Sequence, residues 1–521
     1  MSYQHLALLV AALQGPVAQR PPTPQLVVHI TIDQFRADYL DRWRGQLTGG
    51  LARLLDGGAV FTDAYQDHAM SETAPGHATV LSGRNPHSTG IVHNDQGVSD
   101  RNDPGELLDV AGPGASPWRL RGTELFDWMQ AAWPDARALS VSRKDRAAIL
   151  PLGHARQSVY WYQGGQFTTS RYYADSLPAW VRAFNARAVS ARAPGLAWTL
   201  LLAPSAYAEP DSADYENHGR DFVFPHVLPA DAAGAAAAVA GMPWMDSLTL
   251  ALALDGVRSL GLGTGDHPDL LAVSLSTTDA VGHAFGPDSR EIHDQVLRVD
   301  RYLGAFLDSL ARLVAPGRLV VSLTADHGVT SFPEWWNAHG DSHAQWLDLR
   351  GLVRADSQKL AAAAGPGRWI RFFDDGLLVM DRPGLASHGV DVDSVVAAIA
   401  AQIRSYAPVL RVDTRRSLAA SDTATDAIAR RWINLAPPDL DAELFVTLKP
   451  HMSWGVPGNA EHGQPSDDDT HVPLILWGAG VRPGRYGGRV SVADIAPTLA
   501  AILGVRLLEK ADGRVLTEAL R

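Results

Sequence analysis

Four apolar, β-branched runs constrain the fold of this chain more than any other feature. They are Gln25–Ile32, Leu270–Ser276, Arg318–Leu323 and Val472–Trp477. Such runs are typical of central parallel strands that are covered on both faces. Between two of them, Asp288–Val314 has apolar residues at helical spacing and charges on the opposite face. We therefore predict an α/β fold with a mainly parallel central sheet flanked by helices.

Two segments interrupt this alternation of strands and helices. Residues 157–241 are rich in aromatic, Pro and Ala residues, and residues 336–453 mix charged helical patterns with loops. We interpret both as inserted cap segments within a single α/β domain over residues 25–521. An independent second domain is the less favoured alternative, because the candidate site residues extend from 33 to 471. A further helix is predicted over Val492–Leu503, kinked or broken by Pro497.

Composition excludes several classes of protein. The 521 residues include no Cys, which rules out disulfides, cysteine-based zinc sites and thiol catalysis. The net charge of −12 and the scattered Lys and Arg residues argue against a nucleic-acid partner. No stretch approaches the roughly 18–20 apolar residues that span a bilayer, so we predict no membrane span.

The N-terminus carries a short apolar run, Leu6–Leu13, followed by small residues near Ala18. This pattern predicts a signal peptide over residues 1–18 and a periplasmic or secreted protein. Met1–His5 lack the positive charge that usually precedes such a run. The alternative is a frayed N-terminal tail.

Asp and His residues recur beside the predicted strands. Ligands of α/β sheets bind beyond the carboxyl ends of the strands, and zinc accepts His nitrogen and carboxylate oxygen. A lone Asp after a strand is usually a turn former or a helix cap, and a lone His is usually structural. Six residues of ligand type in this order instead predict a two-metal phosphate site: Asp33, Asp279, His283, Asp326, His327 and His471.

The local spacing of these residues is compatible with metal binding. Asp279 and His283 are four residues apart, so one helical turn places both on one face. Asp326 and His327 are adjacent, and adjacent side chains on a strand point to opposite faces. Both can reach a metal only if the chain turns there, which we expect Gly328 to permit. Manganese or cobalt could replace zinc with these ligands.

Other histidines compete for the ligand roles. His462 lies close to His471 in the sequence, and we interpret it as a residue that orients a ligand. His339 and His343 lie in a polar loop, where a solvated role is expected. The remaining competitors are His77, His154 and His451.

Thr73 in SETAPGHATVLSG is the candidate nucleophile. A hydroxyl held between two divalent cations ionises without a general base. Ser71 and Thr79 are rivals, but Thr73 is followed by a tight Ala-Pro-Gly-His turn. The alternative role for Thr73 is a helix N-cap, which is compatible with the first.

Three further polar residues are candidates for binding phosphoryl oxygens. Asn94 lies in IVHNDQ, and Lys144 and Arg146 lie in SRKDRAAILPLGH. Preorganised donors stabilise the charge of a transferring phosphoryl group, and Arg can bind two of its oxygens at once. Solvated loop charges are the alternative for Lys144 and Arg146.

These motifs, in this order, resemble the alkaline phosphatase superfamily from about residue 25 to residue 505. ETAPGHATVLSG is similar to the nucleophile motif of the Thr-dependent branch, which includes nucleotide pyrophosphatase/phosphodiesterases. Asn94 together with KDRAAILPLGH resembles more closely the phosphate-irrepressible alkaline phosphatases of that branch. Ser71-Glu72 precedes Thr73 at a place where the family varies. The cap segments, which shape access to the leaving group, are not matched in detail, and this leaves the leaving-group preference open.

The resemblance implies a role for each matched residue. One zinc would be bound by Asp33, Asp326 and His327, and the other by Asp279, His283 and His471. Thr73 would bridge the two Zn²⁺ ions and become phosphorylated. The phosphoryl oxygens would be held by Asn94, Lys144 and Arg146.

The implied function is a two-zinc phosphate monoester hydrolase, an alkaline phosphatase, that acts through a phosphothreonine intermediate. We expect a monomer whose partners are small-molecule phosphate monoesters. The alternative is a phosphodiesterase or nucleotide pyrophosphatase of the same superfamily. A sulfatase is less favoured because SETAPGH lacks its C/S-x-P-x-R nucleophile pattern. A phosphoglycerate mutase is less favoured because that class uses a Ser nucleophile and two manganese ions within a different insertion pattern. A non-enzymatic metal-binding protein is disfavoured because no ligand or nucleophile is missing.

Overall fold

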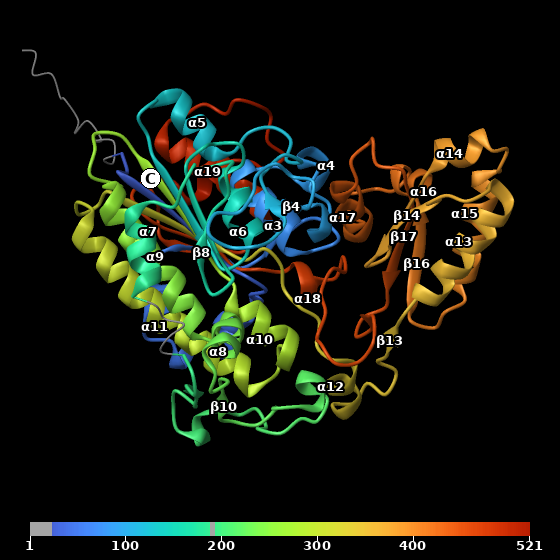
Figure 1. The fold of residues 1–521 in the computed structure, drawn as a ribbon, viewed down its shortest axis with the longest axis horizontal. Coiled ribbons are helices and arrows are strands. Elements are labelled where there is room, and N and C mark those ends of the chain that lie inside the picture. The colour runs from blue at the N-terminus through green and yellow to red at the C-terminus, as the bar shows by residue number, and fades with distance from the viewer. Residues whose placement is uncertain (1–22, 188–192) are drawn as a thin grey trace, which may run out of the picture.

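The computed structural model describes residues 23–187 and 193–521 (Figure 1). The predicted signal peptide, residues 1–18, lies outside the described residues. A nine-stranded sheet crosses the main body, with the strand order β20 (Gly484–Tyr486), β2 (Ala59–Phe61), β19 (Leu474–Gly478), β12 (Leu319–Thr324), β1 (Leu26–Ile32), β11 (Asp269–Leu275), β6 (Ala138–Ser142), β7 (Ser158–Gln163) and β8 (Gln166–Thr168).

The centre of this sheet is parallel, which confirms the predicted fold class. β1 pairs in parallel with β11 on one side and with β12 on the other, and every residue of these three strands is buried. The prediction for Val472–Trp477 was wrong in direction, because β19 runs antiparallel to both β12 and β2. β7 and β8 belong to this sheet although they lie in the segment 157–241 that we interpreted as a cap.

Helices cover both faces of the sheet (Figure 1). One face carries α2 (Gly50–Gly57), α9 (Trp244–Leu260) and α11 (Arg290–Leu313), and the other carries α3 (Thr73–Ser82), α5 (Leu125–Ala132), α6 (Asp145–Ile149) and α19 (Ile495–Leu503). α11 agrees with the helix predicted over Asp288–Val314. Pro497 does not break α19, because it lies in the first turn, where no intrahelical N–H bond is lost.

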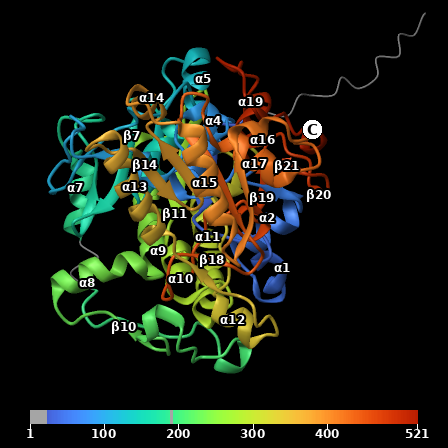
Figure 2. The same cartoon turned by 90° about the vertical axis from the view of Figure 1, so that its right-hand side faces the viewer.

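A small lobe, residues 346–454, has its own four-stranded antiparallel sheet and stands beside the main body (Figures 1 and 2). Its strands follow the order β14 (Ile370–Asp374), β15 (Leu377–Met380), β17 (Ala442–Leu448) and β16 (Val409–Thr414). The helices α13 (Arg350–Ala364) and α15 (Val392–Arg404) pack on it through an apolar core that is separate from the main one. The predicted insertion 336–453 is therefore a folded unit with a core of its own.

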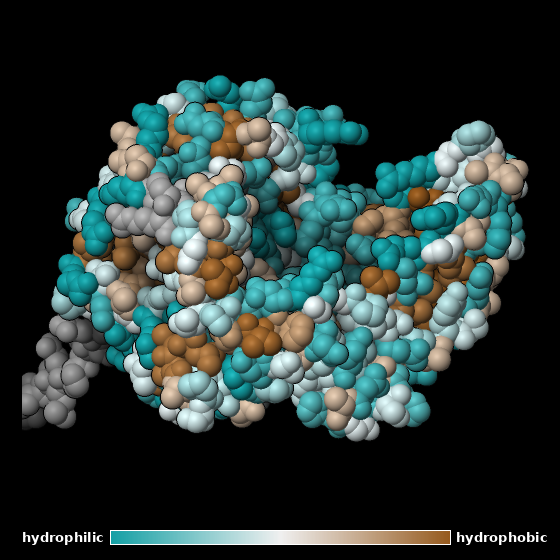
Figure 3. All heavy atoms as spheres, turned by 60° about the horizontal axis from the view of Figure 1, so that its bottom comes forward, coloured by the Kyte–Doolittle hydropathy of each residue, from teal (hydrophilic) through white to brown (hydrophobic). Residues whose placement is uncertain are grey.

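A third apolar cluster joins the small lobe to the main body. It combines Trp432 of α17 (Ala427–Leu435) and Phe445 of β17 with Ala69, Met70 and Val92 of the main body. Ala69 and Met70 lie just before α3. The surface where the two bodies meet is notched and mainly hydrophilic (Figure 3).

The remaining elements are short. They are α1 (Tyr39–Arg42), α4 (Pro86–Thr89), α7 (Ala179–Ala186), α8 (Ala232–Ala238), α10 (Thr277–Phe285), α12 (Pro333–Ala338), α14 (Arg382–Ser387), α16 (Arg415–Ala419), α18 (Asp467–Thr470), β3 (Ala64–Tyr65), β4 (Ser99–Asp100), β5 (Gly114–Ala115), β9 (Ala197–Trp198), β10 (His226–Val227), β13 (Trp346–Leu347), β18 (Ser453–Trp454) and β21 (Val490–Ser491). Within the described residues, no single helix is long and apolar enough to cross a membrane. The helices 232–241 and 244–260 reach the required length and apolar composition only when they are taken together, and the chain is sharply bent between them.

A buried carboxylate fastens α2 to α11. Asp300 of α11 accepts hydrogen bonds from the backbone N–H groups of Thr48 (2.8 Å), Gly49 (2.6 Å) and Ala52 (3.1 Å). These are N–H groups at the start of α2 that have no partner within the helix. The contact is close, since a Cβ at Gly50 would collide with Leu303.

We predict that Asp300→Ala lowers the free energy of unfolding by about 2–3 kcal/mol, because it leaves buried N–H groups unpaired. Urea denaturation of both proteins measures this difference. Asp308→Ala, which removes an exposed carboxylate from the same helix, should cost less than about 1 kcal/mol. Equal losses in the two variants would contradict this role of Asp300.

Candidate metal and phosphate site

The candidate site lies beyond the carboxyl ends of β1, β11 and β12. Asp33 directly follows β1, and its backbone N–H donates to Leu275 O at the end of β11 (2.9 Å). Asp326 and His327 follow β12, and all three side chains are inaccessible to solvent. The parallel register of the strands therefore brings residues far apart in the sequence to one edge of the sheet.

The first ligand group comprises Asp33, Asp326 and His327. One ligand atom from each lies within 4.8 Å of the others. His327 Nε2 is 3.5 Å from Asp33 Oδ1 and 3.7 Å from Asp326 Oδ2. Gly328 is needed here for its size rather than for an unusual φ, because a Cβ would collide with the Asp468 carbonyl oxygen.

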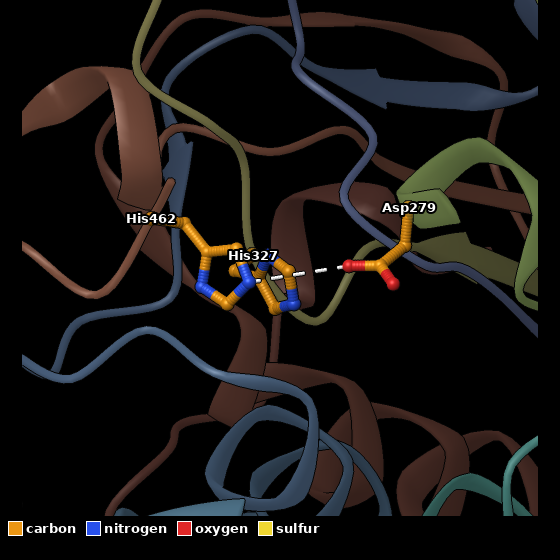
Figure 4. Close-up of side chains that lie close together, drawn as sticks. All are labelled: Asp279, His327 and His462. Carbon is orange, nitrogen blue, oxygen red and sulfur yellow. Dashed lines mark ion pairs between the residues drawn. The ribbon is translucent and has the colours of Figure 1, made fainter. Parts of the chain in front are cut away.

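The second ligand group comprises Asp279, His283 and His462. Asp279 and His283 lie one turn apart on α10, as predicted, with Asp279 Oδ1 3.3 Å from His283 Nε2. His462 Nε2 is 3.2 Å from His283 Nε2 and 3.9 Å from Asp279 Oδ1. The two groups adjoin, because the His462 ring stacks on His327 at 3.8 Å between centroids (Figure 4).

His471, the sixth predicted ligand, lies elsewhere. Its Nε2 contacts Thr62 O (3.1 Å), and its ring stacks on Tyr65. A nitrogen engaged by a carbonyl oxygen is a donor and has no lone pair free for a metal. That prediction was wrong, and His462, which we interpreted as an orienting residue, is in the position of the ligand.

Backbone carbonyls orient all three histidine rings. Nδ1 of His327 donates to Gly328 O (2.9 Å), Nδ1 of His283 to Ala460 O (2.6 Å) and Nδ1 of His462 to Ser71 O (2.8 Å). With Nδ1–H engaged, Nε2 is the atom that offers a lone pair whenever the ring is neutral. This is the arrangement that outer partners impose on metal-bound histidines.

The polar atoms of the site fit divalent cations. Among the described residues, Asp33 Oδ1 and His327 Nε2 are buried without a hydrogen-bond partner. Burial raises the pKa of Asp33 well above its usual range, and the nearby Asp279 and Asp326 add to the rise. Burial, with His327 and His283 nearby, holds the pKa of His462 well below its usual value, so its ring is neutral. Burial lowers the pKa of His283, but the charge of Asp279 outweighs this effect and raises that pKa to about 9, so a metal ion bound to its Nε2 would displace a proton. Crowded carboxylates and the neutral His462 imidazole are ligands that a metal ion would stabilise.

Thr73 lies at the start of α3, and Lys144 links its hydroxyl to both ligand groups. Lys144 Nζ is 3.0 Å from Thr73 Oγ1 and 2.7 Å from both Asp33 Oδ2 and Asp279 Oδ2. The ammonium group thus supplies positive charge between the two ligand groups, beside the candidate nucleophile. His77, one turn further along α3, contacts Thr73 O through Nδ1 (2.8 Å).

Asn94 is held by the residues on either side of Thr73. The side-chain Oδ1 of Asn94 accepts a hydrogen bond from the backbone N–H of Ala74 (2.9 Å), and the backbone N–H of Asn94 donates to Glu72 Oε2 (2.6 Å). Since Oδ1 is engaged, the side-chain NH₂ remains as the donor for a ligand. Burial raises the pKa of Glu72 to about 8, while the charge of Arg146 acts against the rise. The role of Arg146 as a phosphoryl contact stays a prediction.

Sequence reasoning missed Glu72 as part of the site. Its only signal was its place directly before Thr73.

The arrangement as a whole combines a hydroxyl at a helix N-terminus, two adjoining groups of metal-type ligands and a cluster of cationic and amide donors. It defines a metal-dependent hydrolase site for a phosphoryl-sized anion.

The comparisons with known proteins agree with this class. Residues 27–436 match the family model described as type I phosphodiesterase / nucleotide pyrophosphatase, and the chain belongs to this family.

Several relatives match along nearly the whole chain. Alkaline phosphatase PhoK of Sphingomonas sp. is 32% identical, over 95% of this chain and 91% of the relative. Alkaline phosphatase PafA of Elizabethkingia meningoseptica is 29% identical, over 96% of this chain and 95% of the relative. A crystal structure of alkaline phosphatase PafA superposes with a TM-score of 0.87 at 28% identity, over 96% of this chain and 99% of that chain.

We predict that His462→Ala lowers the affinity for Zn²⁺ by more than about 100-fold, beyond the 10–100-fold typical of outer partners. Competition with a chromophoric chelator measures the affinity. His471→Ala is the matched control and should leave it unchanged. The opposite ranking of the two variants would restore His471 as the ligand.

Proposed function

We propose that this chain is a two-zinc alkaline phosphatase that hydrolyses small phosphate monoesters through phosphorylated Thr73. The observation that carries the proposal is the contact of Lys144 Nζ with Thr73 Oγ1 at 3.0 Å, beside the Asn94 amide. A dianionic phosphoryl group at Thr73 would accept hydrogen bonds from Lys144, from the Asn94 amide and from Arg146. The full-length similarity to named alkaline phosphatases supports the same function.

The ligand groups described above would hold the metals, with Asp33, Asp326 and His327 in one and Asp279, His283 and His462 in the other. Bound Zn²⁺ supplies Lewis acidity and lowers the pKa of an attached hydroxyl or water. Thr73 Oγ attacks phosphorus as the ester P–O bond breaks, and the alcohol leaves. Water then attacks the phosphothreonine, releasing inorganic phosphate and restoring the Thr73 hydroxyl.

The remaining residues bind and orient the phosphoryl group. The Asn94 side-chain NH₂ is aimed by its Oδ1 bond to Ala74 N–H. Lys144 has a flexible four-carbon stem, so its ammonium group can move from the carboxylates to a phosphoryl oxygen on Thr73. Arg146 presents a planar fork suited to two oxygens.

A phosphodiesterase is the second candidate, because the matched family model is named for diesterases. A diester has one fewer charged oxygen than a monoester. The Lys144 ammonium group beside Thr73, with Arg146 two residues further along the chain, therefore favours the dianionic monoester.

We expect Thr73→Ala to reduce turnover of p-nitrophenyl phosphate by at least about 10³-fold, since removal of a nucleophile is among the largest single losses in an enzyme. Ser71→Ala is the matched control: it removes a neighbouring hydroxyl that contacts Gln464 O, and it should retain activity. Activity of Thr73→Ala near that of the wild type, with contaminating phosphatase excluded, would disprove the nucleophile.

The double variant Lys144→Ala/Arg146→Ala should lose monoester activity at least about 10²-fold more than diester activity, because charged hydrogen bonds contribute about 1.5–3 kcal/mol each. The measurement is kcat/KM for p-nitrophenyl phosphate and bis-p-nitrophenyl phosphate on zinc-loaded protein. Arg156→Ala, an exposed control, should change neither. Equal losses on the two substrates would favour the diesterase.

We also propose that the enzyme is exported to the periplasm or secreted. The proposal rests on the apolar run Leu6–Leu13 and on the small residues that follow it. N-terminal sequencing of the mature protein would test it.

A further inference from the structure

Gln34 has a backbone conformation that is unusual for its residue type. It lies directly after Asp33 with φ at 61°, in the left-handed region, and its side chain is inaccessible to solvent. This region is unfavourable for residues other than glycine, and such strain concentrates at functional sites. A glycine there would be favoured by the backbone alone, so the side chain needs another explanation.

The left-handed turn directs two donors of Gln34 to different carboxylates. Its backbone N–H donates to Asp326 Oδ1 (3.1 Å), which belongs to the first ligand group. Its side-chain Nε2 donates to Asp279 Oδ1 (3.2 Å), which belongs to the second. One residue therefore contacts a carboxylate of each group and is covalently joined to Asp33 as well.

Gly282 of α10 provides the space for this side chain. A Cβ at Gly282 would collide with Gln34 Oε1. Oε1 has no hydrogen-bond partner among the described residues. The amide therefore lies with its donor end against Asp279 and its acceptor end against the Gly282 backbone, and the helix that carries Asp279 and His283 packs directly on it.

We propose that Gln34 is a positioning residue that sets the separation of the two ligand groups. The proposal rests on the proposed metal-dependent function. Catalytic metal pairs work at separations of about 3.5–4 Å, and a displacement of about 1 Å can reduce a rate about 10²-fold. A residue that contacts carboxylates of both groups is suited to fix that separation.

Two variants separate this role from a purely structural one. Gln34→Met keeps the length of the side chain but removes the amide, and Gln34→Gly also relieves the backbone at φ 61°. Both should weaken the binding of one Zn²⁺ by about 10–100-fold and lower kcat by a similar factor. KM for p-nitrophenyl phosphate should stay within about twofold of the wild type, because the phosphoryl-binding residues are untouched. The Tm of zinc-free Gln34→Gly should not fall.

Gln295→Met is the matched control. Gln295 is equally buried and donates to a carboxylate outside both ligand groups, Asp246 Oδ2 (2.8 Å). It should lower Tm and leave zinc affinity unchanged. Gly282→Ala should weaken zinc binding when it is introduced into the wild type. In the Gln34→Gly background it should weaken binding little further, because the atom with which the new Cβ collides is gone. Such non-additivity of the two substitutions reports direct contact between the residues.

Chelator competition, zinc content, Tm and steady-state kinetics on the full chain give distinguishable outcomes. Wild-type zinc affinity and kcat in both Gln34 variants would overturn the positioning role while leaving the proposed function intact. A loss of Tm without a change in zinc affinity would also overturn it. A wild-type protein that binds no Zn²⁺ would disprove the proposed function and this role together.

Discussion

Three buried carboxylates, on Asp33, Asp279 and Asp326, are the constraint on which the rest of the structure depends. Like charges in a poorly hydrated place repel strongly, and burying one without a partner is costly. The ammonium group of Lys144, which is 2.7 Å from two of these carboxylates, offsets part of this repulsion. Oriented donors such as the Gln34 backbone N–H also stabilise the carboxylates. Asp33 and Asp326 follow the ends of two paired parallel strands, so the sheet keeps these two carboxylates at close range.

The small lobe takes part in building the site. Its sheet packs on Ala69 and Met70, which precede the helix that begins with Thr73. Further along, the ring of Phe372 on β14 stacks on His93, the neighbour of Asn94, at 4.1 Å between centroids. The lobe thus holds both the segment before the nucleophile and the loop that carries a phosphate donor.

The sequence predicted the central strands, α11 and the placement of Asp33 and Asp326, because apolar runs that stop at a polar residue are local signals. It could not predict the direction of β19, since an apolar run has the same composition in a parallel and in an antiparallel strand. It also could not predict the strands β7 and β8, which lie in a segment of cap-like composition. It also misassigned His471. His462 and His471 lie on either side of the short helix α18, in a stretch without periodicity, and the choice between them depends on a carbonyl of Ser71, 391 residues away from His462.

The late position of His462 in the chain has a consequence for biogenesis. A growing chain presents Asp33 early, but the second ligand group stays incomplete until residue 462 has been made and its ring has reached the Ser71 carbonyl. Contacts between such distant residues form late in folding. The second ligand group is therefore complete only after nearly the whole chain has been made, so a metal ion held by that group would be acquired after translation has passed residue 462.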